Sequence, residues 1–241
     1  LPLLAERWPA YAKTRARSAG HCAEAQQLID RLAGEQQAAC AGSRPERLSL
    51  SRLGELDAPL ARAVLRHWIK SQGFSLPNRL RLERVLAEVL TAAPDRRPLV
   101  TWPGCEIRRY RGDLYLLEPL PKRPGPLRLC WEDSVLRLPD PLGRLRVLGK
   151  APTEAVVDVR FRAGGEVCRP AGNAHRKPLK KLFQEAGIPG WLRDYVPLIY
   201  IDDQLAAVAG LVRCEPFASH PAAGIRWEGH PWETILVNAA R

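Results

Sequence analysis

The chain has 241 residues, of which 46% are hydrophobic and 26% are charged, as in ordinary globular proteins. Lys and Arg number 37 against 26 Asp and Glu, which gives a formal net charge of +11. Such a surplus favours a polyanionic partner, and RNA, DNA and anionic membrane are the candidates. Membrane is the weakest of these, because no uninterrupted apolar run approaches the ~20 residues of a spanning helix.

Cysteine spacing is the next constraint on the class of protein. There is no C-x-x-C pair and no histidine at ligand spacing, which argues against structural zinc and against a dense disulfide framework. We therefore predict no metal site, reduced thiols and a cytoplasmic location. The first ten residues lack the basic flank and apolar core of a signal peptide. The chain begins at Leu1 instead of Met, which suggests a fragment of a longer protein.

The first third of the chain predicts three amphipathic helices. From Tyr11 to about Ala41, apolar residues recur at spacings of three and four, which gives one apolar face. Ser51 is a plausible N-cap for a second helix that Gly73 ends, and a third runs from about Leu76 to Ala93. Short connections between them predict a small helical bundle.

The hydrophobic period then changes from helical to strand-like. The runs 99–102, 105–110 and 114–117 are separated by turn residues and predict a β-meander that closes a first domain, residues 1–118. The segment 119–126 has four prolines, cannot donate regular ladder hydrogen bonds, and is predicted to be a stiff linker.

Residues 127–241 predict a second domain of short strands around one clear helix. The strand candidates are 127–131, 135–138, 144–148, 156–161, 198–201 and 205–212. Pro178 opens the helix, Leu179, Leu182 and Phe183 form its inner stripe, and Gly187 ends it. The predicted class is α+β: an N-terminal helical bundle with a small β-meander, then a mixed α+β domain.

The most informative stretch runs from residue 160 to residue 181. It holds one acid, Glu166, and seven cationic side chains: Arg160, Arg162, Arg169, Arg176, Lys177, Lys180 and Lys181. On a strand, Arg160 and Arg162 would leave the same face. The glycines of this stretch allow a loop whose amides approach a phosphate, and cations in the first turn of a helix favour a bound anion. The alternative is a solvated basic face without a partner.

A long motif within this stretch carries a resemblance. Residues 168–194 read C-R-P-A-G-N-A-H-R-K-P-L-K-K-L-F-Q-E-A-G-I-P-G-W-L-R-D, which resembles the C-terminal domain of tRNA(Ile)-lysidine synthetases. Upstream, L-R-H-W at 65–68 and R-R-Y-R-G-D-L-Y-L at 108–116 resemble the preceding substrate-binding region. The resemblance is strong over 159–212 and moderate over 1–118.

The resemblance implies a role in tRNA modification. Members of this family use ATP, with magnesium, and free lysine to convert the wobble cytidine of the CAU-anticodon isoleucine tRNA to lysidine, so that AUA is read instead of AUG. Their ATP loop, S-G-G-x-D-S, does not occur in this sequence. The chain is therefore expected to bind no cofactor, to carry no catalytic residue and to be inactive alone.

What the resemblance leaves to this chain is tRNA recognition, with neither DNA nor membrane as a partner. The expected tRNA-binding residues are Arg160, Arg162, Arg169, His175, Arg176, Lys177, Lys180, Lys181 and Arg193. Arg193 and Asp194 could equally form an ion pair that only orders the loop. The oligomeric state is left open, with a homodimer as one alternative. The other functional hypothesis is a free-standing basic RNA-binding module or adaptor without an enzymatic partner domain.

Other candidates for chemistry are weaker. Cys168 and His175 could form a nucleophile and base, but no orienting Asn or Asp is evident, so we expect Cys168 to be packing. Tryptophans can stack on bases, and the roles of Trp227 and Trp232 stay open at this point.

Overall fold

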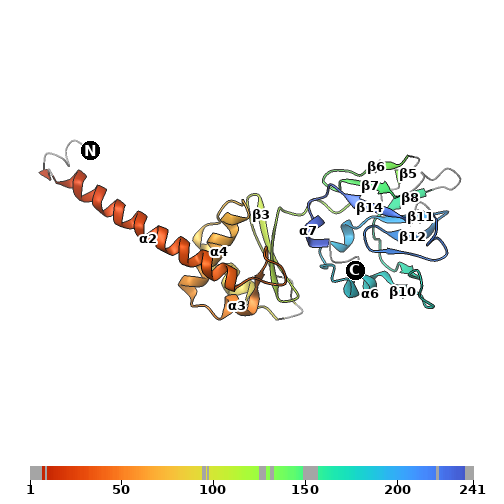
Figure 1. Cartoon of the computed structure of the whole chain (residues 1–241), viewed down its shortest axis with the longest axis horizontal. Coiled ribbons are helices and arrows are strands. Elements are labelled where there is room, and N and C mark those ends of the chain that lie inside the picture. Colours follow the sequence, from red (N-terminus) through yellow and green to blue (C-terminus); the bar gives the residue numbers. More distant parts are fainter. Residues whose placement is uncertain are drawn as a thin grey trace. The chain divides into compact units, whose positions relative to one another are not determined.

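A computed structural model describes residues 7–8, 10–93, 96, 98–124, 129–130, 133–148, 157–220 and 223–236. The chain divides into two compact units, Leu1–Leu120 and Pro121–Arg241. We describe each unit by itself. Helices are confined mainly to the first unit and antiparallel sheets occur in both, so the predicted α+β class is confirmed (Figure 1).

The N-terminal unit contains more helices than its periodicity predicts. They are α2 (Tyr11–Ala39), α3 (Leu50–Gly54), α4 (Ala58–Ser71), α5 (Arg79–Arg84) and a π turn at Val85–Val89. The single helix expected from Ser51 to Gly73 is wrong. Asp57 accepts a hydrogen bond from the amide of Leu60 at 2.8 Å and so begins a separate helix.

A four-stranded antiparallel sheet completes this unit, in the order β1-β4-β3-β2. Its strands are β1 (Leu48–Ser49), β2 (Leu99–Trp102), β3 (Cys105–Tyr110) and β4 (Asp113–Leu117). The predicted meander is confirmed. Gly104 and Gly112 occupy the turns with φ of 78° and 84°, a region that a residue with a Cβ rarely adopts. The edge strand β1 escaped prediction because two residues show no alternation.

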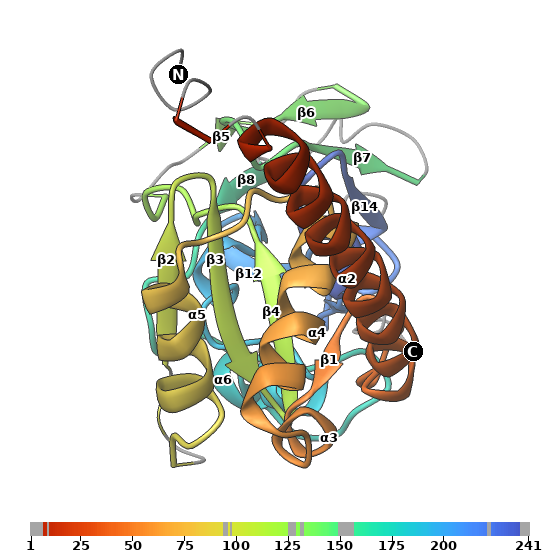
Figure 2. The same cartoon turned by 90° about the vertical axis from the view of Figure 1, so that its left-hand side faces the viewer.

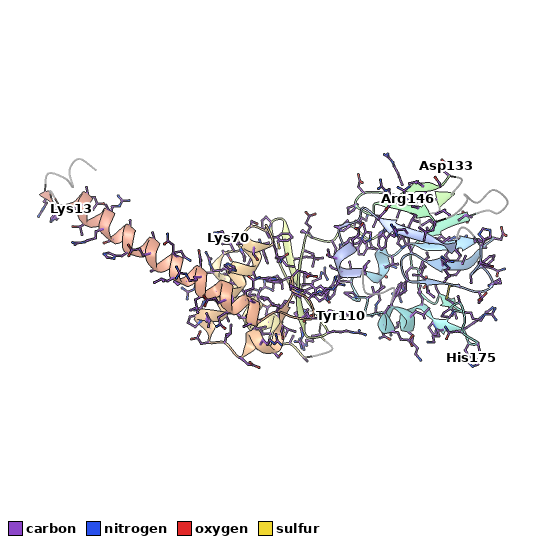
Figure 3. The ribbon with its side chains drawn as sticks, viewed as in Figure 1. Lys13, Lys70, Tyr110, Asp133, Arg146 and His175 are labelled. Carbon is purple, nitrogen blue, oxygen red and sulfur yellow. A yellow bond between two sulfur atoms is a disulfide. The ribbon has the colours of Figure 1, made fainter. Side chains whose placement is uncertain are left out.

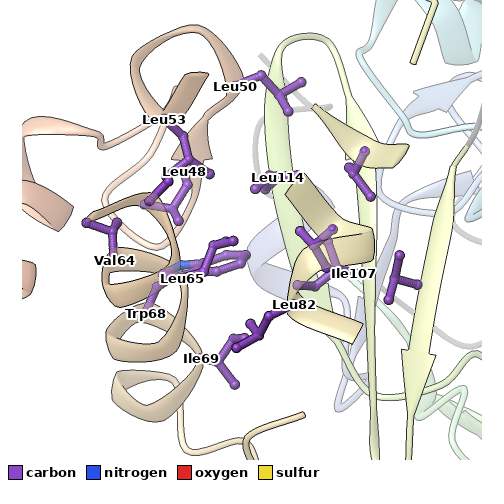
Figure 4. Packing of buried hydrophobic residues seen from close by; sticks show 14 of the residues in the cluster. Leu48, Leu50, Leu53, Val64, Leu65, Trp68, Ile69, Leu82, Ile107 and Leu114 are labelled. Atoms are coloured by element: carbon purple, nitrogen blue, oxygen red, sulfur yellow. The ribbon is translucent and has the colours of Figure 1, made fainter. Parts of the chain in front are cut away.

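The core of the N-terminal unit lies between α4 and the sheet. Leu65, Trp68 and Ile69 of α4 are fully buried and face Ile107 and Leu114 (Figure 4). The indole N–H of Trp68 donates to the carbonyl of Glu46 at 2.9 Å, so its one polar group is satisfied.

The apolar stripe of α2 does not behave as predicted. α2 and α4 lie side by side (Figure 2), but Ala33 is the one residue of α2 that is buried in the described part of the chain. Leu28 and Ile29 are 62% and 47% exposed. Only the last turns of α2 therefore join the bundle. No helix among the described residues combines the length and the apolar character that crossing a membrane requires.

The C-terminal unit is built from two sheets and a hairpin. The five-stranded sheet has the order β13-β12-β11-β8-β5, and the three-stranded sheet has the order β14-β7-β6. The strands are β5 (Leu129–Cys130), β6 (Val135–Arg137), β7 (Arg144–Val147), β8 (Val157–Arg160), β11 (Leu198–Ile201), β12 (Gln204–Val208), β13 (Val212–Arg213) and β14 (Ile225–Glu228).

Shorter elements of this unit were not predicted. They are the hairpin strands β9 (Val167–Cys168) and β10 (Lys177–Pro178), a 3-10 turn at Arg193–Tyr195 and α7 (Glu233–Leu236). The run 205–212, expected as one strand, is split by a turn at Gly210 into β12 and β13. The predicted helix after Pro178 is confirmed as α6 (Leu179–Glu185).

Candidate nucleic-acid interface

A short hairpin carries most of the basic stretch. β9 and β10 pair antiparallel with Lys177 opposite Cys168, and α6 follows β10 directly. The amide of Leu179 donates to the carbonyl of Glu166 at 2.9 Å, which fixes the start of α6 on the hairpin. Figure 1 places β10 and α6 on one side of the five-stranded sheet and β6 and β7 on the other, and Figure 2 shows the same for α6.

The loop between β9 and β10 is tied to β13 at its base. The amide of Ala171 donates to the carbonyl of Arg213 at 2.9 Å, and the amide of Glu215 donates to the carbonyl of Arg169 at 2.8 Å. Pro170 and Cys214 form an isolated antiparallel bridge. Backbone pairing therefore presents residues 169–176 as a supported loop.

Five of the predicted site residues gather on this loop and on the outer side of α6. They are Arg169, His175, Arg176, Lys180 and Lys181, and all five are exposed. Among the residues that the structure describes, no carboxylate forms an ion pair with any of these five side chains. His175 lies at the outer edge of the unit (Figure 3). We call these five residues the loop cations.

Arg213 adds one exposed cation that the sequence did not single out. It is brought beside the loop by the backbone hydrogen bond to Ala171. No local signal could have found it, because this hydrogen bond and the neighbouring Pro170–Cys214 bridge join segments that lie about 40 residues apart in the sequence.

Three other predicted site residues form ion pairs with carboxylates of their own unit. Lys177 lies 3.1 Å from Glu185. Arg160 contacts Asp158 and Asp203, and its guanidinium lies 4.3 Å from the ring centre of Tyr200. Arg162 Nη1 lies 3.3 Å from Asp194.

Arg193, the remaining predicted site residue, is buried. Its side chain is 7% exposed and its Nε donates to the carbonyl of Ile188 at 3.1 Å. Asp194, its expected ion-pair partner, accepts instead from Arg162 and lies 3.6 Å from Nε of Arg123. The geometry gives Arg193 a structural environment, because a buried guanidinium cannot reach a phosphate on the surface.

Two of the physical arguments for a phosphate site do not hold in the structure. The amides of Ala163 and Gly164 donate to Glu166 Oε1 at 2.6 and 2.8 Å, so the glycine turn is filled by a carboxylate of its own chain. Helix α6 has seven residues and Pro178 as its N-cap, so its dipole is small. Support for a phosphate site therefore rests on exposed cationic side chains that have no ion-pair partner among the described residues.

The prediction that all cysteines are reduced is wrong for one pair. Cys168 and Cys214 form a disulfide with a Cα–Cα distance of 5.9 Å. Cys168 is at the end of β9 and Cys214 follows β13, and spacing could not pair residues 46 apart. The bond also engages the sulfur of Cys168, which is consistent with a packing role for that residue.

The two tryptophans that were left open belong to the core of the C-terminal unit. Trp227 and Trp232 are 8% and 2% exposed. Trp227 stacks on His230 at 3.7 Å and donates to the carbonyl of Leu142 at 2.7 Å. Burial lowers the pKa of His230 to about 4, so its imidazole is neutral at pH 7. Because both indole rings are buried, neither is available to stack on a nucleic-acid base.

Metal ligands do not cluster in the described ranges, where no group of three or more His, Cys, Asp or Glu side chains could hold an ion.

Two family models match the chain, one in each unit. Residues 48–115 match the TilS substrate binding domain, and residues 157–228 match the TilS substrate C-terminal domain. The second match contains the hairpin, α6 and all nine predicted site residues.

Full-length relatives agree with both matches. A tRNA(Ile)-lysidine synthase of Coxiella burnetii is 41% identical over 235 residues, which cover 94% of this chain and 51% of that protein. One from Serratia proteamaculans is 41% identical over 242 residues, covering 96% of this chain and 53% of the relative. The chain thus spans about half the length of the curated relatives it matches. It belongs to the family formed by the substrate-binding and C-terminal domains of tRNA(Ile)-lysidine synthases.

Proposed function

We propose that this chain docks the isoleucine tRNA with the CAU anticodon for a lysidine-forming ligase, and that the loop cations contact its phosphates. The observation that carries the proposal is the cluster of five exposed cationic or ionisable side chains without an ion-pair partner among the described residues. Unpaired Arg side chains on the supported loop and unpaired Lys side chains on α6 can neutralise phosphates without first breaking an internal ion pair.

The proposal separates contact residues from supporting residues. Arg169, Arg176, Lys180 and Lys181 are the proposed phosphate contacts, with His175 as a hydrogen-bond donor beside them. Arg160, Arg162, Lys177 and Arg193 are proposed to shape the surface through the contacts described above. Arg213 is proposed as an additional phosphate contact because its backbone supports the loop.

The proposal gives this chain no part in the ATP chemistry. ATP, magnesium and lysine would be used by a phosphate loop of the S-G-G-x-D-S type, a motif that these 241 residues do not contain. Lysine transfer to the wobble cytidine is therefore proposed for the complete enzyme, in the cytoplasm, and not for this chain alone.

A salt titration of tRNA binding tests the proposal. About six phosphate contacts predict a ~10³-fold loss of affinity between 50 and 200 mM salt, with allowance for RNA differing from B-DNA. Arg169→Ala combined with Arg176→Ala should lower the affinity and make the salt dependence less steep by about two. Arg137→Ala, which removes an exposed cation from β6, is the matched control.

Two outcomes would contradict the proposal. A flat salt titration would mean that the basic face is only solvated. An equal loss of affinity for each charge removed, in Arg137→Ala and in the loop variant, would mean that net charge, and not the loop, determines binding.

A further inference from the structure

The first residues of the C-terminal unit lie against the 3-10 turn at Arg193–Tyr195. The hydroxyl of Tyr195 donates to the carbonyl of Pro121 at 2.6 Å. Arg123 Nη2 donates to the carbonyl of Arg162 at 2.6 Å, and Arg123 Nε lies 3.6 Å from Asp194 Oδ2. The proline-rich segment is therefore held at two successive points, Pro121 and Arg123.

The surface that holds the segment is itself fixed in the unit. Tyr195 is 7% exposed and its ring centre lies 5.0 Å from that of Trp232. Asp194 is oriented by Arg162, whose Nη1 donates to it at 3.3 Å. Because the side chains of Tyr195 and Asp194 are themselves fixed by contacts within the unit, they can restrain the segment.

The composition of the segment explains why it needs side-chain donors. Proline has no N–H, so a chain with prolines at 119, 121 and 124 cannot hold itself by a regular hydrogen-bond ladder. Its carbonyl oxygens still need donors when they approach the protein. Tyr195 supplies such a donor to the carbonyl of Pro121, and Arg123 donates from the segment to the carbonyl of Arg162. Only Glu118, Pro119 and Leu120 separate Pro121 from the end of β4 at Leu117.

We propose that Tyr195, Asp194 and Arg123 are positioning residues that restrict the chain between the two units, so that both units can engage one tRNA together. The inference rests on the proposed function. Two linked binding units gain affinity through effective concentration, and this gain is larger when the linker is already ordered. None of the three residues is assigned a contact with RNA.

Limited proteolysis measures the anchor directly. Lys122 is exposed within the segment, and a lysine-specific endoprotease can cut after it. Tyr195→Phe keeps the ring and removes the hydroxyl, so cleavage after Lys122, followed by mass spectrometry, should become several-fold faster. Tyr200→Phe is the matched control, because Tyr200 is a half-buried tyrosine on β11 that stacks with Arg160. Its cleavage should stay at the wild-type rate.

Binding to two RNAs separates positioning from a general structural role. Tyr195→Phe should weaken binding of whole tRNA by roughly 3- to 10-fold, while binding of a short RNA hairpin that engages one unit stays unchanged. Arg123→Ala, on an exposed side chain, should give the same pattern even if Tyr195→Phe lowers the melting temperature.

Three other outcomes would contradict the anchor, the positioning role or the proposed function. Unchanged cleavage after Lys122 in both variants would overturn the anchor. Equal weakening for tRNA and hairpin would overturn the positioning role in favour of a local one. If the wild-type chain bound no tRNA, the proposed function would fail, and the cleavage rates would still decide whether the anchor exists.

Discussion

The loop cations and the two arginines at the end of β8 belong to one basic stretch of the sequence. They differ in whether carboxylates of the same unit neutralise their charge. Arg160 and Arg162 contact carboxylates of their own unit. These carboxylates lie on β8, in the turn between β11 and β12, and in the 3-10 turn at Arg193–Tyr195. Arg176 and Lys181 are exposed and have no such partner among the described residues. A count of basic residues therefore overstates the interface, because tertiary neighbours neutralise part of it.

The largest expected effect tests the support beneath the loop cations. Phe183 is fully buried on the inner side of α6. Phe183→Ala should lower the free energy of unfolding by ~3–5 kcal/mol, because it leaves a cavity in the core. Urea denaturation measures the change. A loss below ~1 kcal/mol would mean that α6 is not anchored by this ring.

Arg193 should behave as part of the support and not as part of the interface. Arg193→Ala removes the donor to the carbonyl of Ile188 and leaves that acceptor unsatisfied. We expect a loss of ~1–3 kcal/mol in the free energy of unfolding. Arg169→Ala, on the exposed loop, should change stability by less than ~0.5 kcal/mol. If Arg193→Ala keeps full stability but loses tRNA binding, Arg193 belongs to the interface after all.

The pH dependence of stability should report on the buried histidine, His230. Burial lowers the pKa of His230 to about 4 in the folded chain, from the ordinary histidine value of 6.5. The folded state thus binds this proton less readily than the unfolded state, so stability is full above about pH 6.5 and falls as the pH drops toward 4.

We expect about 1–2 kcal/mol of stability to be lost between pH 7 and pH 5 through His230. Chemical denaturation at several pH values measures this loss, and it should shrink in His230→Gln. Arg169→Gln, which changes an exposed residue of the loop that does not titrate in this range, is the control and should keep the wild-type pH dependence.

The smallest effect on stability is expected from replacing the two lysines of α6, a change that should still weaken tRNA binding. Replacing Lys180 and Lys181 together with Ala should leave the melting temperature unchanged or slightly higher, since neither side chain is buried. The affinity for tRNA should fall and the salt dependence should become less steep by about two. A double variant that melts early and binds tRNA normally would place the interface elsewhere.

The sequence by itself determined the elements whose signal is local. The meander 99–117 and α6 followed from alternation, turn glycines and the Pro178 start, and they lie where predicted. The motif at 168–194 also identified the family without any coordinates, because its residues are contiguous.

Tertiary structure alone decided which basic residues remain available. Asp203 and Asp194 reach Arg160 and Arg162 from over 30 residues away, and the Cys168–Cys214 bond closes a separation of 46 residues. The tertiary structure also leaves the apolar stripe of α2 exposed and buries Trp227 against His230. Periodicity records which face of an element is apolar, but long-range packing decides what covers that face and which charges are neutralised.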